Sequence, residues 1–157
     1  MALAGISTLD VHFYYGVETV VGEKPSTFVE LHRINSIGGV SASTETIDAS
    51  ALEDKATKYI AGRSEVDGTL AVTVNITPET VTEWETLITA YETAKKNGKA
   101  VWFETYSASL GGDAFFVVAE PPTIIPQPET NQNELWTVEM TLTVNDYKGM
   151  DTAVLPT

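Results

Sequence analysis

The chain has 157 residues, with 22 acidic and nine basic side chains and a formal net charge of −13. It contains no cysteine, so disulfides, thiolate zinc sites and cysteine nucleophiles are excluded. Hydrophobic residues make up 43% of the chain, as in ordinary folded proteins, and a single domain over residues 1–157 is expected. Lys and Arg cluster only at Lys95, Lys96 and Lys99, so the basic patch typical of a nucleic-acid-binding site is missing.

The N-terminal sequence MALAGISTLDVH lacks the basic start and the long apolar core of a signal peptide. No apolar run approaches the roughly 20 residues that a bilayer-spanning helix requires. We therefore expect a soluble protein that is synthesised in the cytoplasm and has no membrane partner.

The first half of the chain has three stretches typical of strands. Asp10–Val17 (DVHFYYGV) is rich in aromatic and β-branched residues, and Thr27–Ile37 (TFVELHRINSI) follows after a turn region. The glycines Gly38-Gly39 end the second stretch. Thr69–Ile76 (TLAVTVNI) alternates apolar and polar residues, which indicates a sheet with one buried face.

The stretch from Pro78 to Asn97 predicts the one helix. Thr77 or Thr80 can cap its N-terminus, Pro78 suits its first turn, and Gly98 can end it. Large apolar residues recur at helical spacing and predict a stripe that packs on a sheet, which core packing explains better than ligand binding. The members of this stripe are Val81, Trp84, Leu87, Ile88 and Tyr91.

Three more strands follow the helix, at Ala100–Tyr106, Asp113–Ala119 and Glu134–Val144. The connection from Pro121 to Gln132 has four prolines and must be extended. The last eight residues, 150–157, show no pattern and are expected to be a loose tail. Runs of strands with one isolated helix predict a mainly β fold: a largely antiparallel sandwich or barrel with a flanking helix and a long protruding loop.

The sequence contains no recognised catalytic or cofactor-binding motif. P-loop, dinucleotide-binding, HExxH and GxSxG patterns are absent, so no catalytic residue, cofactor or metal ligand is predicted and the chain is not expected to be an enzyme. His12 could share a strand face with Asp10, and His32 with Glu30, but no third metal ligand is apparent. Ordinary structural histidines are the expected interpretation.

The segment from about Val40 to Asp67 is too long and too polar for a turn, and loops of such length in compact domains are usually functional or disordered. Leu52, Ala56, Tyr59 and Ile60 are apolar residues spaced through it. Three structures remain open: a helical turn near Leu52–Lys58, an extended arm that packs on another chain, or a hairpin folded over its own domain. As an arm, it offers these candidate contact residues: Glu45, Ile47, Asp48, Leu52, Asp54, Lys55, Tyr59, Ile60 and Arg63.

The same segment carries a family resemblance. From Ile37 to Ile76 the chain has a glycine turn, then ETIDAS, LEDKA, YIAGR and DGTLAVTVN, and the helix and the late WTVEMTLTV strand keep the same order. In this order of motifs the chain resembles the major tail tube proteins of long-tailed bacteriophages, over about Gly16 to Gly149. The N-terminal stretch matches the family less clearly.

The resemblance implies a virion protein of the phage tail that assembles with itself. Tail tube proteins are similar in having a β-sandwich or barrel with a flanking helix, and they form rings, typically of six copies, that stack into a tube. The implied partners are other copies of the chain, the tape measure protein and the tail tip or terminator proteins. DNA would pass through the lumen without specific binding, because the acidic chain repels phosphate.

Two other functions remain open from the sequence. One is a carbohydrate- or ligand-binding β-sandwich module, in which exposed Trp102 or Tyr106 would form a stacking platform. The other is a different tail component of similar fold, such as a tail completion or baseplate protein.

Overall fold

The computed structural model of the chain describes residues 4–66 and 68–156. It contains nine strands, one α-helix and a short 3-10 helix, Ala108–Leu110, within the part of the chain that it describes. The strands are β1 (His12–Val17), β2 (Val29–Leu31), β3 (Ile34–Ile37), β4 (Ala42–Asp48), β5 (Tyr59–Val66), β6 (Thr69–Asn75), β7 (Val101–Tyr106), β8 (Asp113–Glu120) and β9 (Thr137–Thr152). The helix is α1 (Pro78–Lys96). The predicted fold class, mainly antiparallel β with one flanking helix, is confirmed.

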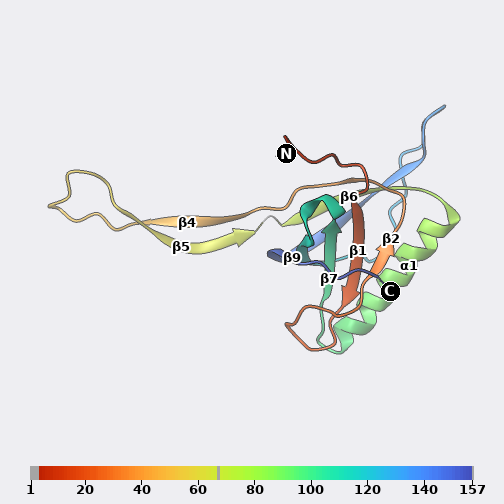
Figure 1. Ribbon diagram of the computed structural model, residues 1–157, viewed down its shortest axis with the longest axis horizontal. Helices are drawn as coiled ribbons and strands as arrows, with labels where there is room; N and C mark the ends of the chain where they lie inside the picture. Colours follow the sequence, from red (N-terminus) through yellow and green to blue (C-terminus); the bar gives the residue numbers. More distant parts are fainter. Residues whose placement is uncertain (1–3, 67, 157) are drawn as a thin grey trace.

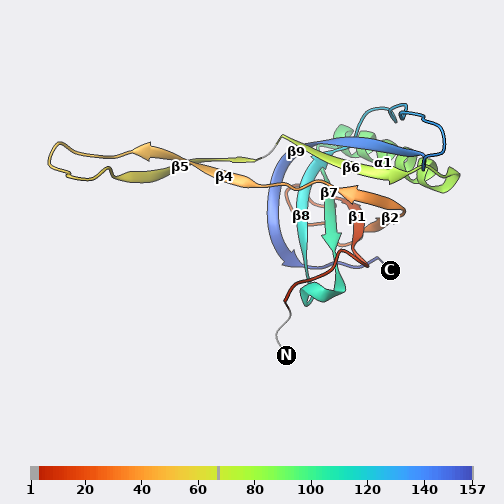
Figure 2. The ribbon, with the colours of Figure 1, turned by 90° about the horizontal axis from the view of Figure 1, so that it is seen from above.

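Seven strands form one sheet in the order β2-β1-β7-β8-β9-β6-β3, and every neighbouring pair is antiparallel. Strands β4 and β5 form a separate two-stranded sheet. Figure 1 shows this hairpin reaching far out from the body, while α1 lies along the body's opposite side. Figure 2, seen from above, shows β9 curving around the body.

The curvature of the sheet comes from β9 and its partner β8. The first half of β9 pairs with β6 and the second half pairs with β8. The register shifts twice along the β8 pairing, between Phe116 and Val117 and between Val118 and Ala119. Such bulges bend a strand and increase its local twist. The bent sheet therefore gains a concave face that the helix can cover.

The main core lies between this concave face and the helix. Trp84 and Leu87 of α1 are fully buried there, with Phe103 of β7 and Met140 of β9 among the residues around them. Of the predicted helix stripe, Trp84 and Leu87 are buried, whereas Val81, Ile88 and Tyr91 are half-buried. Thr80 and Ala94 complete the buried side of the helix, because small residues let the helix approach the sheet closely.

A capping box begins the helix as the sequence indicates. The Thr77 side chain accepts a hydrogen bond from the Thr80 backbone N–H at 3.1 Å, and the Thr77 backbone N–H donates to the Thr80 hydroxyl at 2.9 Å. These bonds satisfy donors that a helix N-terminus otherwise leaves unpaired.

The prediction of one strand over Thr27–Ile37 was wrong. The chain breaks at Arg33, which has a left-handed backbone with a φ of 56°, and it divides into β2 and β3. Strand β2 pairs with β1 at one edge of the sheet, and β3 pairs with β6 at the other edge. A single residue in this conformation thus carries the chain from one sheet edge to the other, and the two edges meet at this corner.

The prediction of a loose C-terminal tail was also wrong for the described residues. Residues 150–152 are the end of β9, where Met150 pairs with Phe115. Beyond the strand, the Val154 N–H donates to the buried Glu104 carboxylate at 3.0 Å. Burial raises the pKa of Glu104 to about 7. The tail is held because it covers a second apolar cluster of Tyr14, Phe28, Trp102, Ala114, Phe116 and Val118 on the other face of β1, β7 and β8. Thr157 lies outside the described residues.

We predict that Trp84→Ala lowers the free energy of unfolding by about 3–5 kcal/mol, because it leaves a cavity between helix and sheet. Trp84→Phe should lower the free energy of unfolding by less than Trp84→Ala. Its ring keeps most contacts and removes an indole N–H that finds no acceptor among the described residues. Thr89→Ala, on the exposed side of α1, is the control and should change stability by less than about 0.5 kcal/mol. Urea unfolding measures all three, and equal losses for Ala and Phe would contradict this account.

Candidate assembly interface

The most unusual feature of the molecule is the β4–β5 hairpin, which we call the arm and define as residues 42–66. Its register runs from Ala42 opposite Val66 to Asp48 opposite Tyr59, with one irregularity between Thr44 and Thr46. Figures 1 and 2 both show it extending away from the body, so it does not fold over its own domain. The expected segment ended at Asp67, which lies outside the described residues.

Four large apolar side chains of the arm, Ile47, Leu52, Tyr59 and Ile60, belong to neither buried cluster of the body. Ile47 is 51% exposed, Ile60 is 55% exposed, and Leu52 at the tip is completely exposed. Ile47 and Ile60 are opposite each other in the register and share one face of the arm, while Tyr59 lies on the other face and is also exposed. The arm thus presents apolar surface to solvent at positions where a folded chain usually buries it.

The tip of the arm is a turn held by its own hydrogen bonds, and the helical turn considered for Leu52–Lys58 is not present. The Ser50 N–H donates to the Asp48 carboxylate at 2.9 Å, and the Ala51 N–H donates to Asp54 at 2.8 Å. The bond from Ser50 lowers the pKa of Asp48. The Lys58 N–H closes the turn by donating to the Ser50 hydroxyl at 2.7 Å. Local bonds therefore fix the shape of the tip without help from the body.

The arm carries charged side chains of both signs. Within the described part of the chain, Lys55, Lys58 and Arg63 form no ion pair. Glu45 is exposed and Asp54 is half-buried by the turn. All nine predicted contact residues, Glu45, Ile47, Asp48, Leu52, Asp54, Lys55, Tyr59, Ile60 and Arg63, therefore lie on one protruding element. Whether they contact a neighbour remains a prediction.

The outer face of the β6–β9 pair is a second distinctive surface. Its cross-strand pairs are Thr69 with Thr143, Ala71 with Thr141, Thr73 with Glu139, and Asn75 with Thr137. Intervening pairs such as Val72 with Met140 point into the core and are buried. This outer face, which we call the threonine face, is polar and small-chained, and Glu139 is its only charged residue.

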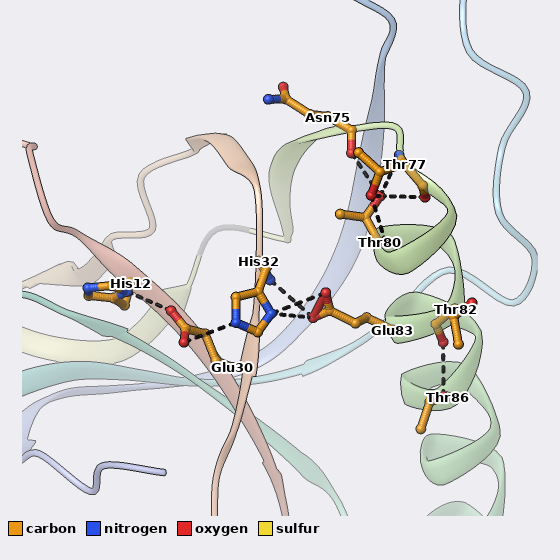
Figure 3. A network of polar contacts seen from close by, with 9 residues as sticks. All are labelled: His12, Glu30, His32, Asn75, Thr77, Thr80, Thr82, Glu83 and Thr86. Atoms are coloured by element: carbon orange, nitrogen blue, oxygen red, sulfur yellow. Dashed lines mark hydrogen bonds and ion pairs between the residues drawn. The ribbon is translucent and has the colours of Figure 1, made fainter.

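The two histidines are part of a polar joint between sheet and helix, drawn in Figure 3. The Glu30 carboxylate of β2 contacts His12 Nδ1 at 2.6 Å and His32 Nε2 at 3.3 Å. His32 Nδ1 and its backbone N–H both reach the Glu83 carboxylate of α1, at 3.0 and 3.1 Å. His32 and Glu30 therefore pair as the sequence suggested, while Asp10 lies before β1 in a left-handed conformation. Among residues 4–66 and 68–156, no group of three or more His, Asp or Glu side chains is arranged to hold a metal ion.

The stacking platform of the carbohydrate-binding alternative does not form. Trp102 is only 5% exposed, and its indole N–H donates to the buried Glu18 carboxylate at 2.9 Å. Glu18 also accepts from the Gly22 and Ala100 backbone N–H groups. Tyr106 is half-buried and packs beside Tyr14. Sequence reasoning missed this buried carboxylate, because Glu18 looks like an ordinary turn residue.

Comparison with known proteins identifies the fold. No family model and no curated protein matches the chain. Three solved structures are similar over nearly the whole chain. A chain of the anti-feeding prophage baseplate, symmetrised six-fold, is 14% identical with a TM-score of 0.54, over 99% of this chain and 100% of that one. A chain of the tail of an empty gene transfer agent particle, refined with C6 symmetry, is 12% identical with a TM-score of 0.56, over 95% and 99%. A chain of an extracellular contractile injection system sheath-tube complex is 15% identical with a TM-score of 0.52, over 90% and 88%.

These matches define the class of fold to which the chain belongs, one found in protein components of phage-tail-like particles. The identities are too low to define more than the fold. Within the described residues, no helix has both the length and the apolar composition that crossing a membrane requires.

The polar joint predicts a pH effect. The hydrogen bond to Glu83 raises the pKa of His32 above its ordinary value of 6.5. The stabilisation from the pair is therefore present below pH 6.5 and is lost as the pH rises through the raised pKa. Glu83→Gln should lower the free energy of unfolding more at pH 6 than at pH 8. Because His32 is 60% exposed, the difference should be below about 1 kcal/mol.

An NMR titration of His32 and denaturant unfolding at the two pH values measure the effect. Glu85→Gln is the control, since Glu85 is exposed on the same helix and forms no ion pair among the described residues. If Glu83→Gln left the pKa of His32 unchanged, the contact between His32 and Glu83 would contribute no electrostatic stabilisation.

Proposed function

We propose that this protein is a structural, non-catalytic subunit of a phage tail, and that its copies assemble into stacked rings that form the tail tube. The observation that carries the proposal is the arm: a well-formed hairpin whose large apolar side chains Ile47, Leu52, Tyr59 and Ile60 are exposed and belong to neither core cluster. The fold shared with components of tail-like particles supports the same role. The protein would be synthesised in the bacterial cytoplasm and become part of the virion tail.

Ring formation follows from the open edges of the sheet. The main sheet ends at β2 and β3, whose outer backbone groups have no strand partner among the described residues. Exposed strand edges invite pairing with another chain. Head-to-tail contacts make rings when the rotation closes and filaments when it does not, so a tube needs closed contacts within a layer and open contacts between layers. Six copies per ring agrees with the six-fold symmetry of two of the similar assemblies.

The threonine face suits the lining of a channel. Six copies would carry a formal charge of 6 × −13 = −78 per ring. DNA would pass without binding, because the threonine face has no cation to replace its counterions. A surface of small polar side chains with Glu139 as its only charge offers DNA neither cations nor deep apolar pockets. The tape measure protein and the tail tip or terminator proteins are the further partners proposed.

A second candidate is a baseplate or completion protein of the same fold, and it is favoured by the similar chain from a baseplate. Such a protein would form single closed rings, whereas a tube protein forms continuous tubes. Negative-stain microscopy of the concentrated protein distinguishes the two.

Deletion of Ser43–Arg63 should abolish tubes and leave the thermal transition nearly unchanged, because no residue of this segment belongs to either buried cluster. Negative-stain microscopy and differential scanning calorimetry measure the two outcomes. Tubes formed by the deletion variant would refute a role for the arm in stacking. A large loss of thermal stability would show instead that the arm supports its own body.

A pair of matched double variants tests which side of the arm makes contact. Ile47→Asp with Ile60→Asp replaces the apolar pair by two charges, and should prevent assembly because contact would bury them. Thr46→Asp with Ala61→Asp adds the same charges at the neighbouring exposed pair on the opposite side, and should leave assembly largely intact. Sedimentation velocity compares the two variants, and equal loss in both would contradict a one-sided contact.

A further inference from the structure

The body has one well-formed groove of about 680 Å³ among the described residues, on the concave side of the sheet. It lies between β3 with the residues that follow it and the strands β7, β8 and β9. Its main apolar lining residues are Ile34, Ile37, Val40, Leu70, Phe115 and Tyr147. No lining residue is charged, although the chain has 31 charged side chains.

The groove is incompletely filled by its own chain. Phe115 is 38% exposed, and Ile34, Ile37, Val40 and Tyr147 are only half-buried. Covering such surface contributes about 25 cal/mol per Å² of apolar area. A volume of this size is in the range of sites that enclose a ligand. The absence of charge in the lining requires an uncharged, largely apolar occupant, because an unpaired charge is costly to bury.

The tip of the arm has this chemistry. Residues 49–52 are Ala-Ser-Ala-Leu, without a charge, and Leu52 is completely exposed. The arm points away from its body in both views, so the tip does not reach the groove of its own chain. A tip from another copy can.

The length of the arm matches the distance between adjacent copies that such a contact requires. The arm leaves the body at the groove, since Gly38, Gly39 and Val40 line the groove and β4 begins at Ala42. The ten residue steps from Ala42 to Leu52, of which the seven residues of β4 are strand, span up to about 33 Å when extended. A compact body of roughly 130 residues has a diameter of about 35 Å by the usual scaling of domain size. The arm therefore carries Leu52 about one body width, to where the same groove would lie in an adjacent copy.

We propose that the groove is the acceptor for the arm tip of a second copy, with Leu52 as the residue that enters it. This inference rests on the proposed self-assembly and names the surfaces that make the contact between copies. Each copy donates one tip and accepts one. The contact is thus heterologous and can repeat without limit.

Cysteine cross-linking tests the contact directly, because the chain has no cysteine of its own. One preparation carries Leu52→Cys, and a second carries Ser36→Cys or Thr105→Cys, two positions in the groove. The control acceptor is Thr89→Cys on the exposed side of α1. After mixing and assembly, a short bismaleimide should join Leu52→Cys to both groove variants and not to the control, as read on a denaturing gel.

The possible results separate this inference from the proposed function. Tubes or rings in the micrograph without the groove-specific product would overturn the groove as acceptor and leave self-assembly standing. If the wild-type protein forms no oligomer at any concentration and no product appears, both the acceptor and the tail-subunit role are overturned.

A second measurement does not depend on cysteine geometry. Leu52→Ala should raise the concentration at which assembly begins by about tenfold or more, because the Leu side chain loses its burial in the groove. Ile124→Ala is the matched control, since Ile124 is an exposed apolar residue of the loop before β9, outside the groove, and should leave the threshold unchanged. The reverse pattern would place the contact at that loop and overturn the proposal.

Discussion

Strand β9 is the constraint on which the body depends, because among the described strands it alone joins β2-β1-β7-β8 to β6-β3. Its 16 residues pair first with β6 and then with β8, across two register shifts in the β8 pairing. Without it, β3 and β6 would be a separate two-stranded ribbon, and such ribbons are at best marginally stable in water. The bend that it introduces creates the concave face, and the helix fills that face with Trp84 and Leu87. The same bend leaves space at the other end of the concave face, which is the uncharged groove.

The arm follows from the way this sheet is connected. Strands β3 and β6 are antiparallel neighbours, and a connection of two residues could join them. The chain uses residues 38–68 instead, and forms a hairpin that satisfies its own backbone hydrogen bonds while Ile47, Leu52, Tyr59 and Ile60 stay exposed. A hairpin of this kind contributes little to the stability of its own domain. Its exposed isoleucines and leucine are therefore better explained by contact with another molecule than by folding.

The sequence predicted the elements that local pattern determines. The alternation of Thr69–Ile76 gave β6, and the capping residues and apolar spacing gave α1 to within one residue. The break at Arg33 was not predictable, because left-handed backbone at an arginine has no sequence signal and is imposed by the closure of the sheet. The order in the C-terminal tail was missed for a similar reason, since residues far away in sequence, such as Glu104, hold it in place. Of the candidate interface, the sequence marked the arm but not the groove, whose lining comes from strands distant in sequence and requires the tertiary fold.

Electrostatics limits which surfaces two copies can bring together. Each chain carries a formal net charge of −13, so two copies repel one another at short range. In physiological salt this repulsion is largely screened once the charges are more than about 8 Å apart. Contacts between copies must therefore use surfaces where charge is sparse or balanced. Residues 49–52 of the arm tip and the lining of the groove have no charge, and the rest of the tip balances Glu53 and Asp54 with Lys55 and Lys58. The acids also outnumber the bases on the body, where they would oppose contact between free subunits. In the proposed assembly, the copies would associate through shape and apolar burial at a few uncharged places, while the acidic body would oppose other arrangements of the copies.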